Sequence, residues 1–156
     1  MNKDRGGYWV LAQVLLLALH FALPFFWKGP YSWGKFLEPP MAWIAFPFAL
    51  LGAFFTLGGF FKLGSNLTAF PRPLESGELV DRGVYAFVRH PIYSGLICLC
   101  LAWALLWNSA LPFLSCAGVF VFFERKASRE ERWLVEKYPG YGAYRRRVRK
   151  LVAFLY

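Results

Sequence analysis

The sequence of 156 residues has few cysteines, no internal repeat and no low-complexity tract. Its three cysteines, Cys98, Cys100 and Cys116, all lie inside apolar runs, where a free thiol behaves as a small hydrophobic side chain. Neither a disulfide framework nor the cysteine spacing of a zinc site is present. We therefore expect no structural disulfide and no metal site.

Acidic residues are also scarce, since nine of them stand against 18 lysines and arginines and the formal net charge is +9. Such an excess can indicate nucleic-acid binding, but ten of the basic residues lie within residues 125–150, directly after the last apolar block. A basic tail beside a membrane segment is more typical of the cytoplasmic side, where it attracts anionic lipid headgroups. The expected partner is thus the lipid bilayer, and nucleic acid is not expected.

Hydrophobic residues, by contrast, make up 58% of the chain and aromatic residues 21%, more than in soluble globular domains. Residues 8–26 and 41–61 form apolar blocks close to the roughly 20 residues that a helix needs to cross the hydrocarbon core. The first block follows Lys3 and Arg5 as a secretory signal peptide would, but no small-residue cleavage site ends it. Both blocks are therefore predicted to be retained membrane spans.

A third apolar run, residues 92–123, is interrupted by the polar pair Asn108 and Ser109 and by Pro112. The interruption predicts two helical arms of about 14–16 residues, or roughly 21–24 Å at 1.5 Å per residue. Because that length is short for a full crossing, we expect a hairpin that tilts, thins the bilayer or is extended by polar turns. Whether the two arms fully span the bilayer stays open.

Single polar residues and glycines inside the first two spans favour helix packing over catalysis. Gln13 and His20 are expected to hydrogen-bond a neighbouring helix. Gly52, Gly58 and Gly59 are expected to let another helix approach closely.

The distribution of basic residues orients the predicted spans. Residues 28–40, the loop between the first two spans, carry two lysines and one glutamate. Lys3 and Arg5 precede the first span, residues 62–89 carry four basic residues, and the tail is strongly basic. Because basic loops stay on the cytoplasmic side, both termini are expected in the cytoplasm. The predicted location is the inner membrane of a prokaryotic cell.

Beyond residue 123 the pattern becomes that of a helix that leaves the membrane and ends at Pro139-Gly140. A second amphipathic helix is expected from about residue 142, with arginines on one side and an apolar side formed by Tyr144, Val148, Leu151 and Val152. The predicted fold class is an all-α polytopic membrane bundle. It forms one domain, residues 1–156, with about four transmembrane segments and cytoplasmic C-terminal helices.

Residues 62–89 are rich in proline and glycine and lead into the third apolar run through Arg89, His90 and Pro91. Proline is well tolerated at the first position of a helix, where unpaired backbone N–H groups favour an anionic ligand group. Arg89 and His90 are therefore candidates for binding an anion. By spacing alone, an arginine that reaches the headgroups and a histidine that caps the helix explain the pattern equally well.

Glu130 and Glu131 form a carboxylate pair in a strongly basic stretch near the predicted membrane surface. One interpretation is that they are only the partners of Lys126 or Arg129 at helical spacing. The other is that they bind a cationic group opposite the anion-binding candidates, as recognition of a zwitterionic amino acid moiety requires. The spacing leaves both interpretations open.

Five motifs follow one another between residues 66 and 141. They are Asn66-Leu67-Thr68, Phe70-Pro71-Arg72-Pro73, the run from Gly77 to Tyr85, Arg89-His90-Pro91-Ile92-Tyr93-Ser94-Gly95, and Glu130-Glu131 with Tyr138-Pro139-Gly140-Tyr141. Over residues 63–151 this order resembles the isoprenylcysteine carboxyl methyltransferase family and its prokaryotic relatives. The related membrane phospholipid methyltransferases share the Arg-His-Pro and Glu-Glu elements. The distance between those two elements makes the resemblance specific.

The resemblance implies a membrane-embedded S-adenosylmethionine-dependent methyltransferase with a cytoplasm-facing cofactor pocket and a lipid-side entrance for a lipophilic methyl acceptor. The cofactor-binding residues that it implies are Leu79, Val80, Tyr85, His90, Pro91, Ile92, Tyr93 and Glu130. Arg89 is expected to orient an acidic substrate group or the cofactor carboxylate, and Lys126 to bind substrate. The predicted catalytic residues are Arg89, Glu130 and Glu131, and which glutamate faces the cofactor stays open.

Two departures from the family pattern bear on the methyl acceptor. Eukaryotic members tend to have a histidine where this chain has Gly77, and an arginine where it has Lys126, a position associated with substrate. The resemblance therefore bears on the cofactor more than on the acceptor. The alternatives are a phospholipid or small-thiol methyltransferase on the same scaffold, and a non-enzymatic membrane anchor whose basic tail binds lipid.

Overall fold

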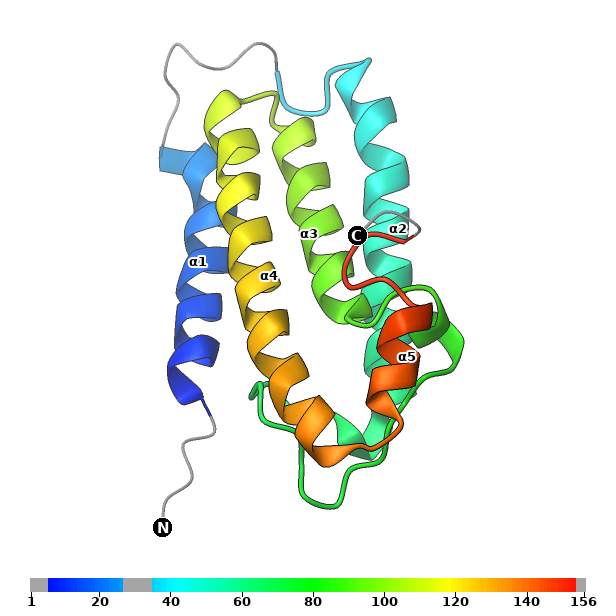
Figure 1. Ribbon diagram of the computed structural model, residues 1–156. Helices are drawn as coiled ribbons and strands as arrows, with labels where there is room; N and C mark the ends of the chain where they lie inside the picture. Colours follow the sequence, from blue (N-terminus) through cyan, green and yellow to red (C-terminus); the bar gives the residue numbers. More distant parts are fainter. Residues whose placement is uncertain (1–5, 27–34, 154–156) are drawn as a thin grey trace.

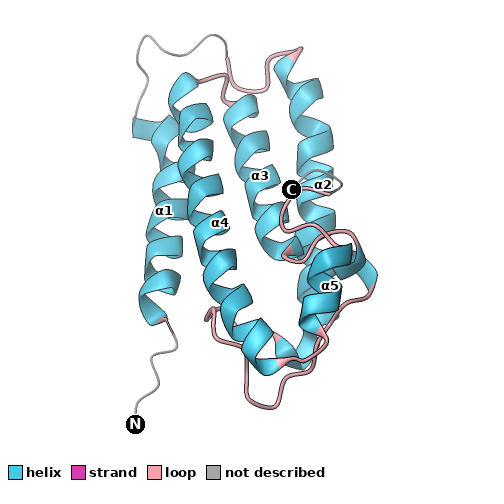
Figure 2. Ribbon diagram, viewed as in Figure 1, coloured by secondary structure: helices cyan, strands magenta, loops and turns pink. Residues whose placement is uncertain are grey.

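The computed structural model describes residues 6–26 and 35–153. Four long helices run side by side in the spatial order α1–α4–α3–α2 (Figure 1), and they are α1 (Gly7–Phe26), α2 (Met41–Leu63), α3 (Pro91–Leu106) and α4 (Ala110–Lys137). Three short elements lie near one end of this row, namely η1 (Gly64–Asn66), η2 (Gly83–Ala86) and α5 (Tyr141–Arg147). Figure 2 shows helices and loops but no strand in this part of the chain, which confirms the all-α prediction.

Two of these helices are long and apolar enough to cross a membrane. They are α1 and the segment Met41–Asn66, which joins α2 to η1, and most of their side chains are not covered by the rest of the protein. The 16 residues of α3 are apolar but shorter, roughly 24 Å at 1.5 Å per residue. The structure thus supports the first two predicted spans, and full crossing by the α3–α4 hairpin stays a prediction.

The connection between α3 and α4 is the tight turn that the sequence predicts. Asn108 has a φ of 49°, in the left-handed region that asparagine adopts more readily than most residues. Its side-chain nitrogen donates to the Lys35 carbonyl at 2.8 Å, and the Leu37 N–H donates to the Leu106 carbonyl at 2.9 Å. The loop before α2 is therefore held against this turn.

Glycines bring the backbones of α2 and α3 into close contact. A Cβ added at Gly95 would lie 2.2 Å from Thr56 Oγ1 and 2.6 Å from the Gly52 carbonyl oxygen. The predicted packing role of the α2 glycines is confirmed, because an added Cβ would come within 2.7 Å of a neighbouring side chain at Gly52, Gly58 and Gly59. In a membrane, where lipid is as apolar as leucine, such close packing is a main source of helix association.

Buried polar side chains tie α1 to its neighbours. His20 is only 1% exposed, and its ring nitrogens lie 2.6 Å from Ser115 Oγ on α4 and 3.1 Å from the Cys100 carbonyl oxygen on α3. Gln13 accepts a hydrogen bond from Lys126 on α4. Both α1 residues thus bond neighbouring helices, as predicted.

The second C-terminal helix is shorter than predicted, because α5 ends at Arg147. Residues 148–151, which we call the C-terminal strap, leave the helical path and lie along the entrance to α3. The backbone N–H groups of Arg89 and His90 donate to strap carbonyls at 2.8 and 3.2 Å, and the Ser94 hydroxyl donates to another at 2.6 Å. The strap carbonyls thus bond residues 89–94, and the chain makes these long-range bonds instead of further helical turns.

We predict that Gly95→Ala lowers the stability of the protein, because the added methyl group meets backbone atoms of α2 that cannot move aside cheaply. Overpacking of this kind costs about 1–3 kcal/mol, and it should lower the unfolding temperature in detergent by roughly 2–12 °C. The matched control is Gly118→Ala on α4, where an added Cβ has no neighbour within 4 Å. Equal unfolding temperatures for the two variants would contradict the packing argument.

Candidate functional site

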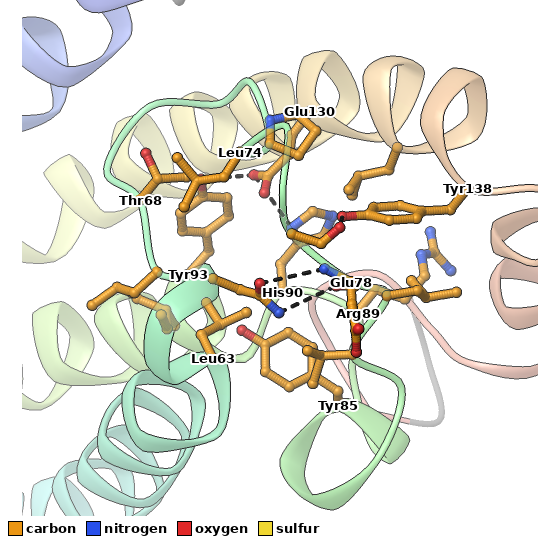
Figure 3. Close-up of a pocket in the computed structure, with 18 of the residues that line it drawn as sticks. Leu63, Thr68, Leu74, Glu78, Tyr85, Arg89, His90, Tyr93, Glu130 and Tyr138 are labelled. Atoms are coloured by element: carbon orange, nitrogen blue, oxygen red, sulfur yellow. Dashed lines mark hydrogen bonds and ion pairs between the residues drawn. The ribbon is translucent and has the colours of Figure 1, made fainter.

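A cavity of about 340 Å³ opens at the end of the bundle that carries the loop of residues 67–82 and α5. Its wall is built from the end of α2, this loop, the first turn of α3, the middle of α4 and α5 (Figure 3). The sequence-predicted site residues that line it are Leu79, Val80, Tyr85, Arg89, His90, Ile92, Tyr93, Lys126 and Glu130. Residues far apart in the sequence thus share one cavity.

Pro91 and Glu131, also predicted as site residues, do not line the cavity. Pro91 is buried as the first residue of α3, where it packs close to Gly59 of α2. The residue before a proline is kept out of the helical region, and His90 has φ −124° and ψ 64°. Pro91 therefore starts the helix directly after the two predicted anion-binding side chains.

Glu131 is the centre of a buried ion cluster. Its Oε1 accepts hydrogen bonds from Arg89 Nε at 2.8 Å and from His90 Nε2 at 3.1 Å, and its Oε2 lies 3.5 Å from Arg145 Nε. The Glu131 side chain is 4% exposed and that of Arg89 is 7% exposed. Since an unpaired buried charge is strongly destabilising, this cluster fixes the α3 entrance to α4.

Arg89 also holds the segment that follows α5. Its Nη1 donates to the Val148 carbonyl and, at 3.2 Å, to the Arg145 carbonyl. With Nε bound to Glu131, two of its three nitrogens act inside the protein. Arg89 also lines the cavity, so this one residue joins the ion cluster, the segment after α5 and the cavity wall.

Glu130 points into the cavity instead. Its Oε2 accepts a hydrogen bond from the Tyr93 hydroxyl at 2.9 Å and lies 3.7 Å from His90 Nδ1. The rings of His90 and Tyr93 stack with centroids 5.4 Å apart and planes 2° apart. Figure 3 shows Glu130 on one side of the cavity and Tyr85 on the other, with His90 and Arg89 between them in this view.

The two neighbouring carboxylates differ in acidity. Burial raises the pKa of Glu130 above its ordinary value, and this outweighs the opposing effects of His90, Tyr93 and Lys126. Burial on its own would also raise the pKa of Glu131, but the hydrogen bonds from His90 and Arg89 outweigh it and bring that pKa to about 2. One carboxylate is thus fixed as an anion, and the other is suited to exchange a proton or bind a cation.

Lys126 lies in the cavity wall one helical turn before Glu130. Its side chain is 1% exposed, and its Nζ donates to Gln13 and, at 3.2 Å, to the Ala69 carbonyl. The same nitrogen lies 5.3 Å from the centroid of the Tyr93 ring, within cation–π range. Lys126 therefore joins α1, the loop and α4 at one point of the cavity.

The loop that closes the cavity is fastened by side chains to which sequence reasoning assigned no role. Asn66 pairs with the backbone of Glu78 through two hydrogen bonds of 3.3 Å. The Tyr138 hydroxyl donates to the Gly77 carbonyl at 2.7 Å, and the Tyr144 hydroxyl donates to the Tyr85 carbonyl at 2.6 Å. Of these side chains, Tyr138 lies in the Tyr-Pro-Gly-Tyr motif and Asn66 in the Asn-Leu-Thr motif, whereas Tyr144 lies in none of the motifs.

A protein family and solved structures of known proteins match this chain. The family model described as phospholipid methyltransferase matches residues 40–140. Four chains of solved structures match, among them the eukaryotic intramembrane Ras methyltransferase ICMT, isoprenylcysteine carboxyl methyltransferase. That match has 21% identity and a TM-score of 0.68, and it covers 99% of this chain and 55% of ICMT, so this chain spans about half the length of its structural neighbour. No curated protein sequence matches significantly.

We predict that Glu131→Gln destabilises the protein at neutral pH, because the variant loses the carboxylate that Arg89 and His90 share. A pKa lowered from 4.5 to about 2 corresponds to about 3 kcal/mol of stability. A lowered folded-state pKa stabilises above pH 4.5, and this contribution is lost as the pH falls from about 4.5 to 2.

Unfolding curves of the parent and the variant in detergent, measured from pH 7 down to pH 3, test this. The stability difference should be largest at pH 7 and should shrink below about pH 4.5. Glu136→Gln on the exposed side of the same helix is the matched control and should change stability by less than about 0.5 kcal/mol. A difference between parent and Glu131→Gln that does not vary with pH would refute the assignment.

Proposed function

Because the chain belongs to the phospholipid methyltransferase family, we propose that this membrane-embedded methyltransferase moves the methyl group of S-adenosylmethionine to a lipophilic acceptor. The observation that carries the proposal is the charged end of the cavity. There the Glu130 carboxylate lies beside His90 and Tyr93, and Arg89 lines the same cavity. Groups of opposite charge in one cavity suit a ligand that is itself zwitterionic.

The residues of the cavity fit this cofactor. The proposed binding set is Leu79, Val80 and Tyr85 for the adenosine part, His90, Ile92 and Tyr93 for the methionine end, and Glu130 for the amino group or the sulfonium region. When bound, its sulfonium would supply a methyl group activated for displacement by a nucleophile. Pro91 acts only by starting α3, and Glu131 acts through Arg89 and His90.

The acceptor decides what Glu130 must do. A carboxylate acceptor, as in isoprenylcysteine, needs no general base at neutral pH, so the protein would only align donor and acceptor. An ammonium acceptor, as in an ethanolamine phospholipid, must lose a proton, and a carboxylate with a raised pKa is a better base for that step. The family description favours the phospholipid, and the structural neighbour favours the carboxyl group.

The experiment that tests the function presents purified protein and labelled S-adenosylmethionine with three acceptors, namely a prenylcysteine analogue, phosphatidylethanolamine in vesicles and a small thiol. We expect transfer to one of the two lipophilic acceptors. Transfer to phosphatidylethanolamine alone would make Glu130 the base of the reaction. Transfer to the thiol alone would overturn the lipophilic acceptor, and a protein that neither binds the cofactor nor transfers methyl groups would be the non-enzymatic anchor.

We predict that Glu130→Gln weakens cofactor binding about ten- to a hundredfold, the effect of losing a charge-assisted hydrogen bond of roughly 1.5–3 kcal/mol. The variant keeps the size of the side chain, so the loss reports on charge. Calorimetric titration with S-adenosylmethionine should give one site per chain in the parent.

Lys126→Ala should leave cofactor affinity largely intact and change methyl acceptance, because Lys126 lies one turn nearer the bilayer, where a substrate head group would enter. Lys126→Met preserves the buried volume and controls for lost packing. If Glu130→Gln binds S-adenosylmethionine as tightly as the parent does, the proposed placement of the cofactor site is wrong.

We also propose that both termini face the cytoplasm. The start of α1 and α5 lie towards the cavity end of the bundle, and a Cβ added at Gly6 would lie 3.0 Å from Pro71 of the cavity-side loop. The basic residues gather at this end, as they do on the cytoplasmic side of membrane proteins. A reporter that works only in the cytoplasm should be active when it is fused after Tyr156, and a reporter that works only outside the cytoplasm should be inactive there. The reverse result would contradict the proposed topology.

A further inference from the structure

Three tyrosines at the corner between α4 and α5 line the cavity, namely Tyr138, Tyr141 and Tyr144. The hydroxyls of Tyr138 and Tyr144 are satisfied, because each donates to a loop carbonyl. Tyr141 is only 1% exposed, and its hydroxyl has no hydrogen-bond partner among the described residues. It is the one hydroxyl of the three whose place in the cavity wall is not explained by anchoring the loop.

The position of this hydroxyl is fixed by packing. The Tyr141 ring meets the Tyr144 ring edge to face with centroids 5.7 Å apart, and Leu79 and Leu134 pack against the same buried cluster. The Tyr141 backbone N–H donates to the Tyr138 carbonyl at 3.0 Å. A buried hydroxyl held rigidly without a partner destabilises the protein by itself, so its presence in a cavity calls for an explanation.

The charges around Tyr141 indicate what it can bind. Burial raises the pKa of its hydroxyl, and the neighbouring Glu131 carboxylate raises it further, although Arg89 opposes them. The hydroxyl therefore keeps its proton at neutral pH and acts as a donor. Arg89 lines the same cavity and acts on the Tyr141 hydroxyl, while its own Nε and Nη1 already bond Glu131 and backbone carbonyls.

We propose that the Tyr141 hydroxyl donates a hydrogen bond to the carboxylate at the amino-acid end of S-adenosylmethionine. A carboxylate accepts hydrogen bonds and donates none, so it suits a neutral donor beside a guanidinium. This inference rests on the proposed function and adds to it a cofactor contact outside the Arg-His-Pro and Glu-Glu motifs. The carboxylate is thereby recognised by α5, and the amino group by Glu130 on α4.

Tyr141→Phe and Tyr144→Phe form a matched pair that separates ligand binding from structure. Without ligand, Tyr141→Phe removes a hydroxyl that bonds nothing among the described residues, so its unfolding temperature should equal or exceed that of the parent. Tyr144→Phe loses the bond to the Tyr85 carbonyl and should unfold about 2–4 °C lower. A Tyr141→Phe variant as unstable as Tyr144→Phe would assign the hydroxyl a structural role and overturn the proposal.

Titration of Tyr141→Phe with two ligands identifies the group that the hydroxyl contacts. Affinity for S-adenosylmethionine should fall about tenfold or more, whereas affinity for decarboxylated S-adenosylmethionine should match that of the parent. Equal losses for both ligands, or no loss for either, would refute the contact with the carboxylate. If the parent itself binds neither ligand, the proposed function fails first, so the two failures are distinguishable.

Discussion

The requirement to pair one buried carboxylate organises the cavity end of this protein. Glu131 lies on α4, and its partners Arg89 and His90 immediately precede α3. Because a buried charge without partners is strongly destabilising, the chain entering α3 is held beside the middle of α4. Arg89 also donates hydrogen bonds to the carbonyls of Arg145 and Val148, so the segment after α5 is held at the same cluster. The cavity is the space that these three segments enclose with the loop before η2.

The Glu-Glu pair divides into a structural and a cavity-facing carboxylate because it lies on a helix. Successive residues of an α-helix point about 100° apart, as 3.6 residues per turn requires. Glu131 therefore meets the ion cluster while Glu130 faces the cavity and the Tyr93 hydroxyl. Their pKa values move in opposite directions for the same reason, since one carboxylate gains an arginine and a histidine as donors and the other is mainly desolvated.

Apolar run lengths predicted α1 and α2, and Asn108 and Pro91 predicted where the hairpin turns and where α3 begins. The family followed from the order of the motifs and is confirmed. Sequence periodicity missed the early end of α5, because long-range bonds from residues 89–94 take the strap carbonyls. It could not separate Glu130 from Glu131 or single out Tyr141, because those distinctions depend on which partners the folded chain brings within hydrogen-bond distance.

The C-terminal strap has a consequence for the order in which the protein is made. Arg89 and the carbonyl of Val148 are 59 residues apart in the chain. At roughly 5–20 residues per second, the ribosome adds the strap about 3–12 s after the entrance of α3. During that interval α1 and α2, the two helices long and apolar enough to cross a membrane, are already made, but the cavity wall is incomplete. A nascent chain that stalls in α4 would therefore carry both of these helices and still be unable to close its cavity.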